Sequence, residues 1–129
     1  MVRSCLNHLN HTSKILDCGV GTGAFSLALL DSIEQPAHVT GIDISHPMLT
    51  QAQQNLENHC TALDLRWGNI RHLPFADESF DAVIFAHVLE HIAEPIETLR
   101  EMVRVLKPGT PLIGSVTRRS LGQVLMALH

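Results

Sequence analysis

Short apolar runs alternate with segments of helical periodicity along most of this chain. The first run is 14–18 (KILDC), and apolar positions recur at helical spacing over 24–33. The same succession follows at 38–43 and 48–59, where Ser45 is the expected N-cap. Strands that alternate with helices build a mostly parallel sheet with helices on both faces. We therefore predict an α/β fold with an open, doubly wound, Rossmann-like sheet flanked by helices.

The second half of the chain continues this alternation. Strands are predicted at 62–67, 80–86 and 111–116, and a helix at 94–106 that ends before a Lys-Pro-Gly stop. The segment 120–129 (SLGQVLMALH) is apolar enough to predict a packed helix after the fifth strand. Ligands of such sheets bind beyond the carboxyl ends of the strands, so the site is expected there.

Composition limits the class of protein. A chain of 129 residues is expected to form a single domain, 1–129, and it contains 45% apolar and 17% charged residues. We find no secretory signal and no apolar run long enough for a membrane span, and expect a cytoplasmic protein. The net charge of −4 without a basic patch argues against a nucleic-acid partner. Cys5, Cys18 and Cys60 lack CxxC spacing and are expected to be reduced thiols.

A glycine-rich stretch, ILDCGVGTGAF at 15–25, follows the first predicted strand directly. Its glycines, Gly19, Gly21 and Gly23, would let the backbone turn tightly and approach a ligand, although such glycines also serve plain turns. Asp43 ends the second strand about twenty residues later, where a carboxylate can bind a ribose diol. A helix cap is the alternative role for Asp43. Residues 19–24 (GVGTGA) also satisfy the dinucleotide fingerprint, so spacing alone leaves NAD open.

The stretch ILDCGVGTGAF resembles the first motif of the class I S-adenosylmethionine-dependent methyltransferases, which has a hydrophobic pair, an acidic residue and G-x-G-x-G. Three further segments resemble later parts of that family in the same order: VTGIDIS, WGNIRHLPFADESFDAVIFAHVLEHI and LREMVRVLKPGTPLIGSV. The resemblance is closest to the small-molecule, Methyltransferase type 11-like branch, which includes quinone-modifying enzymes. It implies S-adenosylmethionine as cofactor, S-adenosylhomocysteine as product, and a small quinone-like or lipid-like methyl acceptor.

The same resemblance implies a set of cofactor-binding residues at the ends of the strands. They are Asp17, Gly19, Gly21, Gly23, Asp43, Ile44, Met48, Gly68, Asn69, Ile70, Ala86 and His87. Asp17 would lie near the methionine amino group, Asp43 would bind the ribose, and Ile44 with Met48 would flank the adenine. Family members often have aspartate in place of Asn69, whose amide oxygen is expected to accept a bond from the adenine amino group.

His87 is the candidate catalytic residue, because histidine is suited to proton transfer near neutral pH and this one follows the fourth strand. Packing against the cofactor is its alternative role. Residues 87–91 (HVLEH) also match the H-x-x-E-H signature of zinc peptidases. That signature needs a long helix, whereas here it follows a buried strand and is interrupted by Pro95. No metal site is therefore expected, and the resemblance implies that Glu90 and His91 orient or cover the site.

The resemblance also implies seven strands, a final antiparallel hairpin and helices before the first strand. Only thirteen residues precede Lys14, and one predicted helix follows the fifth strand, so the domain is expected to be truncated at both ends. An uncovered edge of the fifth strand would favour a homo-oligomer. A truncated or inactive cofactor-binding or interaction module is thus the alternative function. An NAD-dependent oxidoreductase and a zinc hydrolase are less favoured alternatives.

Overall fold

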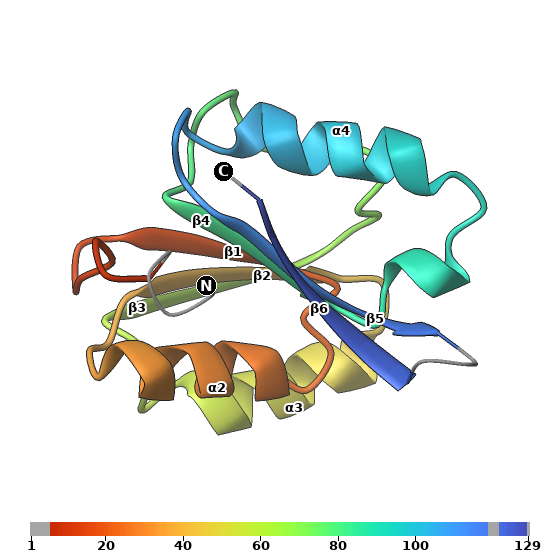
Figure 1. Ribbon diagram of the computed structural model, residues 1–129. Helices are drawn as coiled ribbons and strands as arrows, with labels where there is room; N and C mark the ends of the chain where they lie inside the picture. Colours follow the sequence, from red (N-terminus) through yellow and green to blue (C-terminus); the bar gives the residue numbers. More distant parts are fainter. Residues whose placement is uncertain (1–5, 119–121, 129) are drawn as a thin grey trace.

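A six-stranded sheet with the strand order β3-β2-β1-β4-β5-β6 forms the centre of the molecule (Figure 1). The computed structural model describes residues 6–118 and 122–128. Strands β1 to β5 are parallel to their neighbours, and β6 is antiparallel to β5. The strands are β1 (Lys14–Cys18), β2 (His38–Asp43), β3 (Ala62–Trp67), β4 (Ala82–Ala86), β5 (Leu112–Arg118) and β6 (Gly122–Leu128). In this order the chain runs outward from β1 to β3 and then crosses to β4 on the other side of β1, as in a doubly wound sheet.

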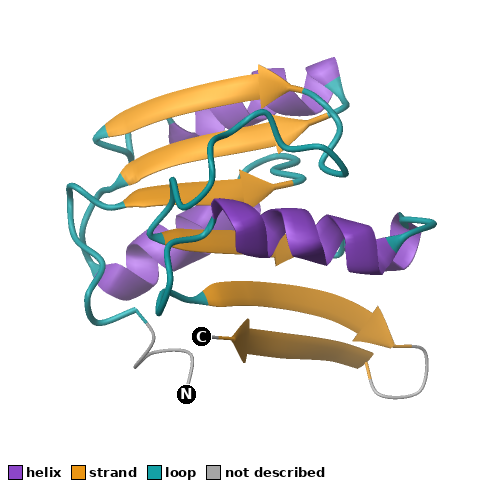
Figure 2. Cartoon of the chain, turned by 90° about the horizontal axis from the view of Figure 1, so that it is seen from above, coloured by secondary structure: helices purple, strands orange, loops and turns teal. Residues whose placement is uncertain are grey.

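Helices cover both faces of the sheet, as the predicted fold class requires. Figure 1 shows α2 and α3 on one face and α4 on the other, and Figure 2 shows the same layers from above. The helices are α2 (Ala24–Ile33), α3 (His46–Leu56), the 3₁₀ helix η1 (Leu89–His91) and α4 (Pro95–Val105). The Ser45 side chain accepts a hydrogen bond from the Met48 N–H, at 3.3 Å, which confirms Ser45 as N-cap. Within the described ranges, no helix is long and apolar enough to cross a bilayer.

The hydrophobic core has one layer on each side of the sheet. Along β4, Ile84 packs toward α2 and α3, whereas Val83 and Phe85 pack toward α4. All three side chains are at most 1% exposed. Successive strand residues point to opposite faces, so a strand covered on both faces has to be apolar throughout. Each such side chain stabilises the fold by roughly 1.5–3 kcal/mol on burial. The buried strands therefore hold the strand ends, which carry the site, in a fixed position.

The helix predicted at 120–129 is wrong for its described part. Residues Gly122–Leu128 form β6, which pairs along the whole of β5 from Leu112↔Leu128 to Arg118↔Gly122. A short apolar run fits either periodicity, and the unpaired edge of β5 offers backbone partners that only a strand can use. The sheet therefore does not stop at the fifth strand. The predicted oligomer through an uncovered β5 edge loses its basis, because β6 covers that edge.

The loop between β3 and β4 is fixed to α4 by one arginine. The Arg104 guanidinium donates to the carbonyl oxygens of Leu73 and Phe75, both at 2.9 Å, and to the Asp77 carboxylate at 2.8 Å. It also pairs with Glu101 at 2.7 Å. Hydrogen bonds from Arg104 to Glu101 and Asp77 raise its pKa, so it stays charged. The loop that begins at the carboxyl end of β3 is consequently held against the α4 layer.

Candidate functional site

A cavity of about 470 Å³ lies at the carboxyl ends of the first four strands. Gly19 follows β1, Asp43 ends β2, Asn69 lies shortly after β3, and His87 follows β4. The lining residues are Gly19, Asp43, Ile44, Gly68, Asn69, Ile70, Arg71, Ala86, His87, Val88, His91, Ile92 and Ala93. Parallel strands place their carboxyl ends at one edge of the sheet, which explains why residues distant in sequence meet here. Most of the predicted cofactor-binding residues thus line one cavity.

Asp43 joins this cavity to the glycine loop. Its Oδ2 accepts a hydrogen bond from the Gly21 N–H at 2.9 Å, and its Oδ1 accepts one from the Ser45 N–H at 2.9 Å. Gly21 has φ +54°, and a Cβ added there would have no atom within 4 Å. The loop therefore leaves open space at Gly21 while Asp43 fixes its path. Each carboxylate oxygen retains a lone pair for a further donor.

Gly23 has a packing role between α2 and α3. It has φ +85°, and an added Cβ would lie 2.8 Å from the Leu56 side chain of α3. Because Leu56 is fully buried in the core, it has little room to move. The third glycine thus allows α2 to begin close against α3.

We expect Gly23→Ala to destabilise the protein by about 2 kcal/mol, because it combines a left-handed backbone with a core clash. A thermal melt should show a decrease of roughly 6–10 °C. Gly21→Ala is the matched control, since it carries the same backbone strain without a steric contact. Its decrease should be about half as large. Equal decreases in the two variants would contradict the packing role of Gly23.

Asp17 is buried in β1, just before the glycine loop in sequence, and does not line the cavity. It is 1% exposed, and its Oδ2 accepts a hydrogen bond from the Ser26 hydroxyl at 2.6 Å. Burial raises the pKa of Asp17 to about 7; the Ser26 bond lowers it and the nearby charge of Asp43 raises it further. Near neutral pH, Asp17 therefore exists in both protonation states. The Ser26 hydrogen bond joins β1 to the first turn of α2, so it links the two elements that the glycine loop connects.

Asn69 and Arg71 form a turn at the wall of the cavity. The Asn69 Oδ1 accepts a hydrogen bond from the Arg71 N–H at 2.9 Å. The Arg71 guanidinium reaches Glu94 at 3.2 Å and Glu97 at 3.3 Å. Its Nε is buried without a hydrogen-bond partner in the described structure. The amide oxygen that the sequence assigned to adenine thus accepts one backbone hydrogen bond and retains one lone pair.

His87 has a strained backbone at the edge of the cavity. Its φ is +54°, which is uncommon for residues other than glycine, and its N–H donates to the Ser115 carbonyl at 2.7 Å. The His87 Nδ1 lies 3.8 Å from Glu90 Oε2. Backbone strain of this kind often marks functional sites, where surrounding contacts enforce it.

The zinc alternative lacks the geometry that its signature requires. His87 lies outside any helix and His91 ends the three-residue helix η1, so the two do not occupy successive turns of one α-helix. Across the described residues, no group of three or more His, Cys, Asp or Glu side chains is placed to hold a metal ion.

Some predicted residues lie outside the cavity lining, and some lining residues were not predicted. Asp17, Gly21, Gly23 and Met48 do not line it. Met48 is 43% exposed on α3. The lining residues missed as binding residues are Arg71, Val88, His91, Ile92 and Ala93. They follow Asn69 or His87 within a few positions in the same loops, and that proximity is the signal that could have indicated them.

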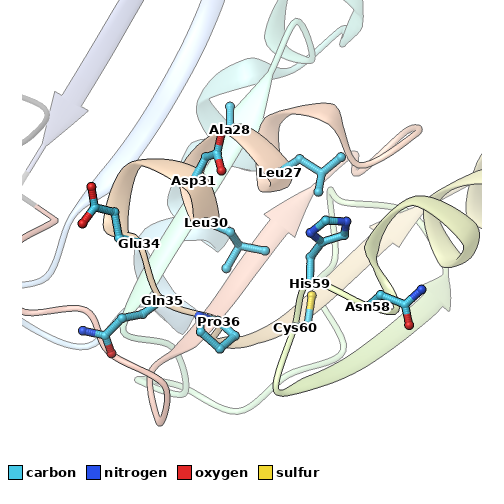
Figure 3. Close-up of a pocket in the computed structure, with 10 residues that line it drawn as sticks. All are labelled: Leu27, Ala28, Leu30, Asp31, Glu34, Gln35, Pro36, Asn58, His59 and Cys60. Carbon is cyan, nitrogen blue, oxygen red and sulfur yellow. The ribbon is translucent and has the colours of Figure 1, made fainter.

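A larger cavity, of about 780 Å³, lies at the opposite end of the sheet (Figure 3). Its lining comes from residues 27–31 of α2, from residues 34–36 before β2, and from residues 58–60 before β3. In Figure 3, Leu30, Pro36 and Cys60 gather around it, whereas Glu34 and Gln35 point outward. Burial raises the pKa of Cys60 to about 11, so its thiol is not a nucleophile at neutral pH. Volume alone would favour this cavity, but the glycine loop and the strand-end carboxylate belong to the smaller one.

The chain is similar to known methyltransferases over the segments that form the smaller cavity. Residues 16–113 match the protein family described as Methyltransferase domain. The chain is 40% identical over 108 residues to the demethylmenaquinone methyltransferase of Lactiplantibacillus plantarum, covering 82% of this chain and 46% of the relative. It is 39% identical to the ubiquinone/menaquinone biosynthesis C-methyltransferase UbiE of Bartonella henselae, covering 74% of this chain and 38% of the relative. The chain thus spans less than half the length of these curated relatives.

A solved structure shows that this fold also occurs with another reaction. The [4+2]-cyclase SpnF superimposes with a TM-score of 0.76 at 27% identity, over 92% of this chain and 44% of the cyclase. The similarity of fold therefore does not by itself identify the reaction.

Proposed function

Because the chain belongs to the class I S-adenosylmethionine-dependent methyltransferase family, we propose that the cavity at its strand ends binds S-adenosylmethionine for methyl transfer. The observation that carries this proposal is the convergence of Gly19, Asp43, Asn69 and His87 from four strand ends on one cavity. The proposed acceptor is a small molecule of the demethylmenaquinone type, which is the substrate class in the name of a relative.

The residues present fit this cofactor. Open space at Gly21 accommodates a close ligand, and Asp43 retains acceptor capacity for a ribose diol beside the loop that it fixes. Ile44 is 68% exposed and lines the cavity, which suits the face of an adenine ring. Gly68 and Ile70 would add backbone contacts to the base. Ala86 and His87 would lie beneath the reactive sulfur.

The contribution of the chain to catalysis is mainly to orient the reactants. When bound, S-adenosylmethionine supplies an electrophilic methyl group on a positively charged sulfur. Asp43 and the glycine loop would fix the ribose and methionine ends, so that the methyl group faces the acceptor in line. His87 would receive the proton that an acceptor carbon loses on methylation, and its Nδ1 lies 3.8 Å from Glu90 Oε2.

The direct test is methyl transfer with the folded chain. The protein would be incubated with S-adenosylmethionine carrying a radiolabelled methyl group and with reduced, short-chain demethylmenaquinone. We expect labelled quinol and an equal amount of S-adenosylhomocysteine. His87→Ala should lower turnover at least tenfold while S-adenosylhomocysteine affinity changes less than threefold.

Calorimetric titration separates this proposal from its alternatives. S-adenosylhomocysteine should bind saturably and NADH should not. Binding without transfer would favour a cofactor-binding module that lacks activity. NADH binding without S-adenosylhomocysteine binding would overturn the proposed cofactor.

A further inference from the structure

The two edge strands of the sheet, β3 and β6, differ in their residue types. Figure 2 shows β6 as the outermost strand on one side of the sheet, beside the C label. Its sequence, GQVLMAL, contains no charged residue and no proline. Edge strands of natural proteins commonly carry such residues, because they prevent pairing with another chain. β6 therefore lacks the sequence features that keep an edge strand unpaired.

The backbone of β6 offers hydrogen-bonding groups to one further strand. β6 pairs with β5 along its whole length, from Gly122 to Leu128. In such an antiparallel ladder, successive residues alternate between bonding to the neighbour and directing their N–H and C=O groups to the other side. Among the described residues, no strand lies on that other side of β6. About half of its backbone groups are thus available, and only a strand can bond to all of them.

The opposite edge of the sheet carries charge. Asp64 and Arg66 of β3 form an ion pair at 3.1 Å, and their side chains are 54% and 48% exposed. A strand that paired with β3 would have to lie beside these charges, which disfavours the pairing. This difference selects the kind of assembly. Pairing of β6 with β3 of the next copy would continue without end, whereas pairing of β6 with β6 closes after two copies.

We propose that two copies of this chain associate through their β6 edges, in antiparallel pairing about a two-fold axis. The dimer joins two six-stranded sheets into one continuous sheet. Antiparallel pairing gives both copies the same set of contacts, as a closed two-fold dimer requires. None of the residues that line the strand-end cavity belongs to β6. The inference is therefore independent of the proposed function, and each copy keeps its own site.

The test measures the mass of the 129-residue chain in solution by light scattering after size-exclusion chromatography. Wild type should have twice the mass of one chain at high micromolar concentration and should dissociate on dilution. Leu125→Lys introduces a charge at the centre of β6 and should raise the dissociation constant of the dimer by about tenfold or more. Ala62→Lys is the matched control, because it adds the same charge at an exposed position of β3. It should leave the dissociation constant unchanged.

Hydrogen exchange of wild type decides the matter should Leu125→Lys fail to fold. The amides of 122–128 should exchange about tenfold or more slowly in concentrated than in dilute solution, whereas those of 62–67 should exchange equally in both. A monomer at every concentration would overturn the inference, as would exchange of 122–128 that is independent of concentration. A dimer that keeps its affinity in folded Leu125→Lys, or loses it in folded Ala62→Lys, would exclude the β6 edge as the interface. Particles that grow beyond two copies would contradict the closed pairing.

Discussion

Asp43→Ala is expected to weaken S-adenosylhomocysteine binding by at least 100-fold. The variant loses the acceptor for a ribose diol, and hydrogen bonds to a charged group contribute about 1.5–3 kcal/mol each. It also releases the Gly21 and Ser45 N–H groups that Asp43 holds at 2.9 Å, so the glycine loop loses its fixed path. Calorimetric titration of wild type and variant measures the effect directly.

Two further variants test whether the loss of binding is specific to the Asp43 carboxylate. Asp31→Ala removes an exposed carboxylate at the far cavity and should leave binding unchanged. Asp43→Asn keeps one oxygen for the Ser45 N–H and should bind more tightly than Asp43→Ala but less tightly than wild type. Circular dichroism would verify that each variant is folded. Binding within threefold of wild type by folded Asp43→Ala would show that Asp43 has only the capping role considered for it.

The second large effect concerns Asp17 and the pH dependence of stability. Burial raises the pKa of Asp17 from 3.8 to about 7 in the folded chain. A raised folded-state pKa gives stability that is fully present below the unfolded value and is lost as pH rises through the folded value. Asp17→Asn removes this titration. We therefore expect the free energy of unfolding of wild type to fall, relative to that of the variant, between pH 4 and 8.

The size of this change is up to about 4 kcal/mol, since one pKa unit corresponds to about 1.4 kcal/mol. Urea unfolding of both proteins at several pH values measures it. The informative quantity is the difference in unfolding free energy between wild type and variant as a function of pH. Its value at a single pH is not informative, because the new amide also changes local hydrogen bonding. Asp31→Asn, at an exposed position, is the matched control. A flat difference for Asp17→Asn would show that Asp17 remains ionised in the folded protein.

The sequence by itself determined the elements that build the parallel sheet. The strand predicted at 14–18, the helix at 24–33 and the strands at 38–43 and 62–67 match the structure at both ends. In these segments the apolar period, the glycine loop and the Ser45 cap all favour the same structure, and such local agreement makes prediction reliable. The order of the motifs along the chain also placed Gly19, Asp43, Asn69 and His87 at strand ends.

Tertiary structure alone decided the features that depend on a partner distant in sequence. Residues 122–128 form a strand because β5 offers an edge, although their apolar run fits a helix equally well. Gly23 contacts Leu56 of another helix, so its packing role could not be seen in the loop motif. The amide oxygen of Asn69 accepts the Arg71 N–H of the adjacent turn, a contact that the residue names do not reveal. Periodicity records which face of an element is buried, whereas strand pairing and contacts between elements exist only once the elements have packed together.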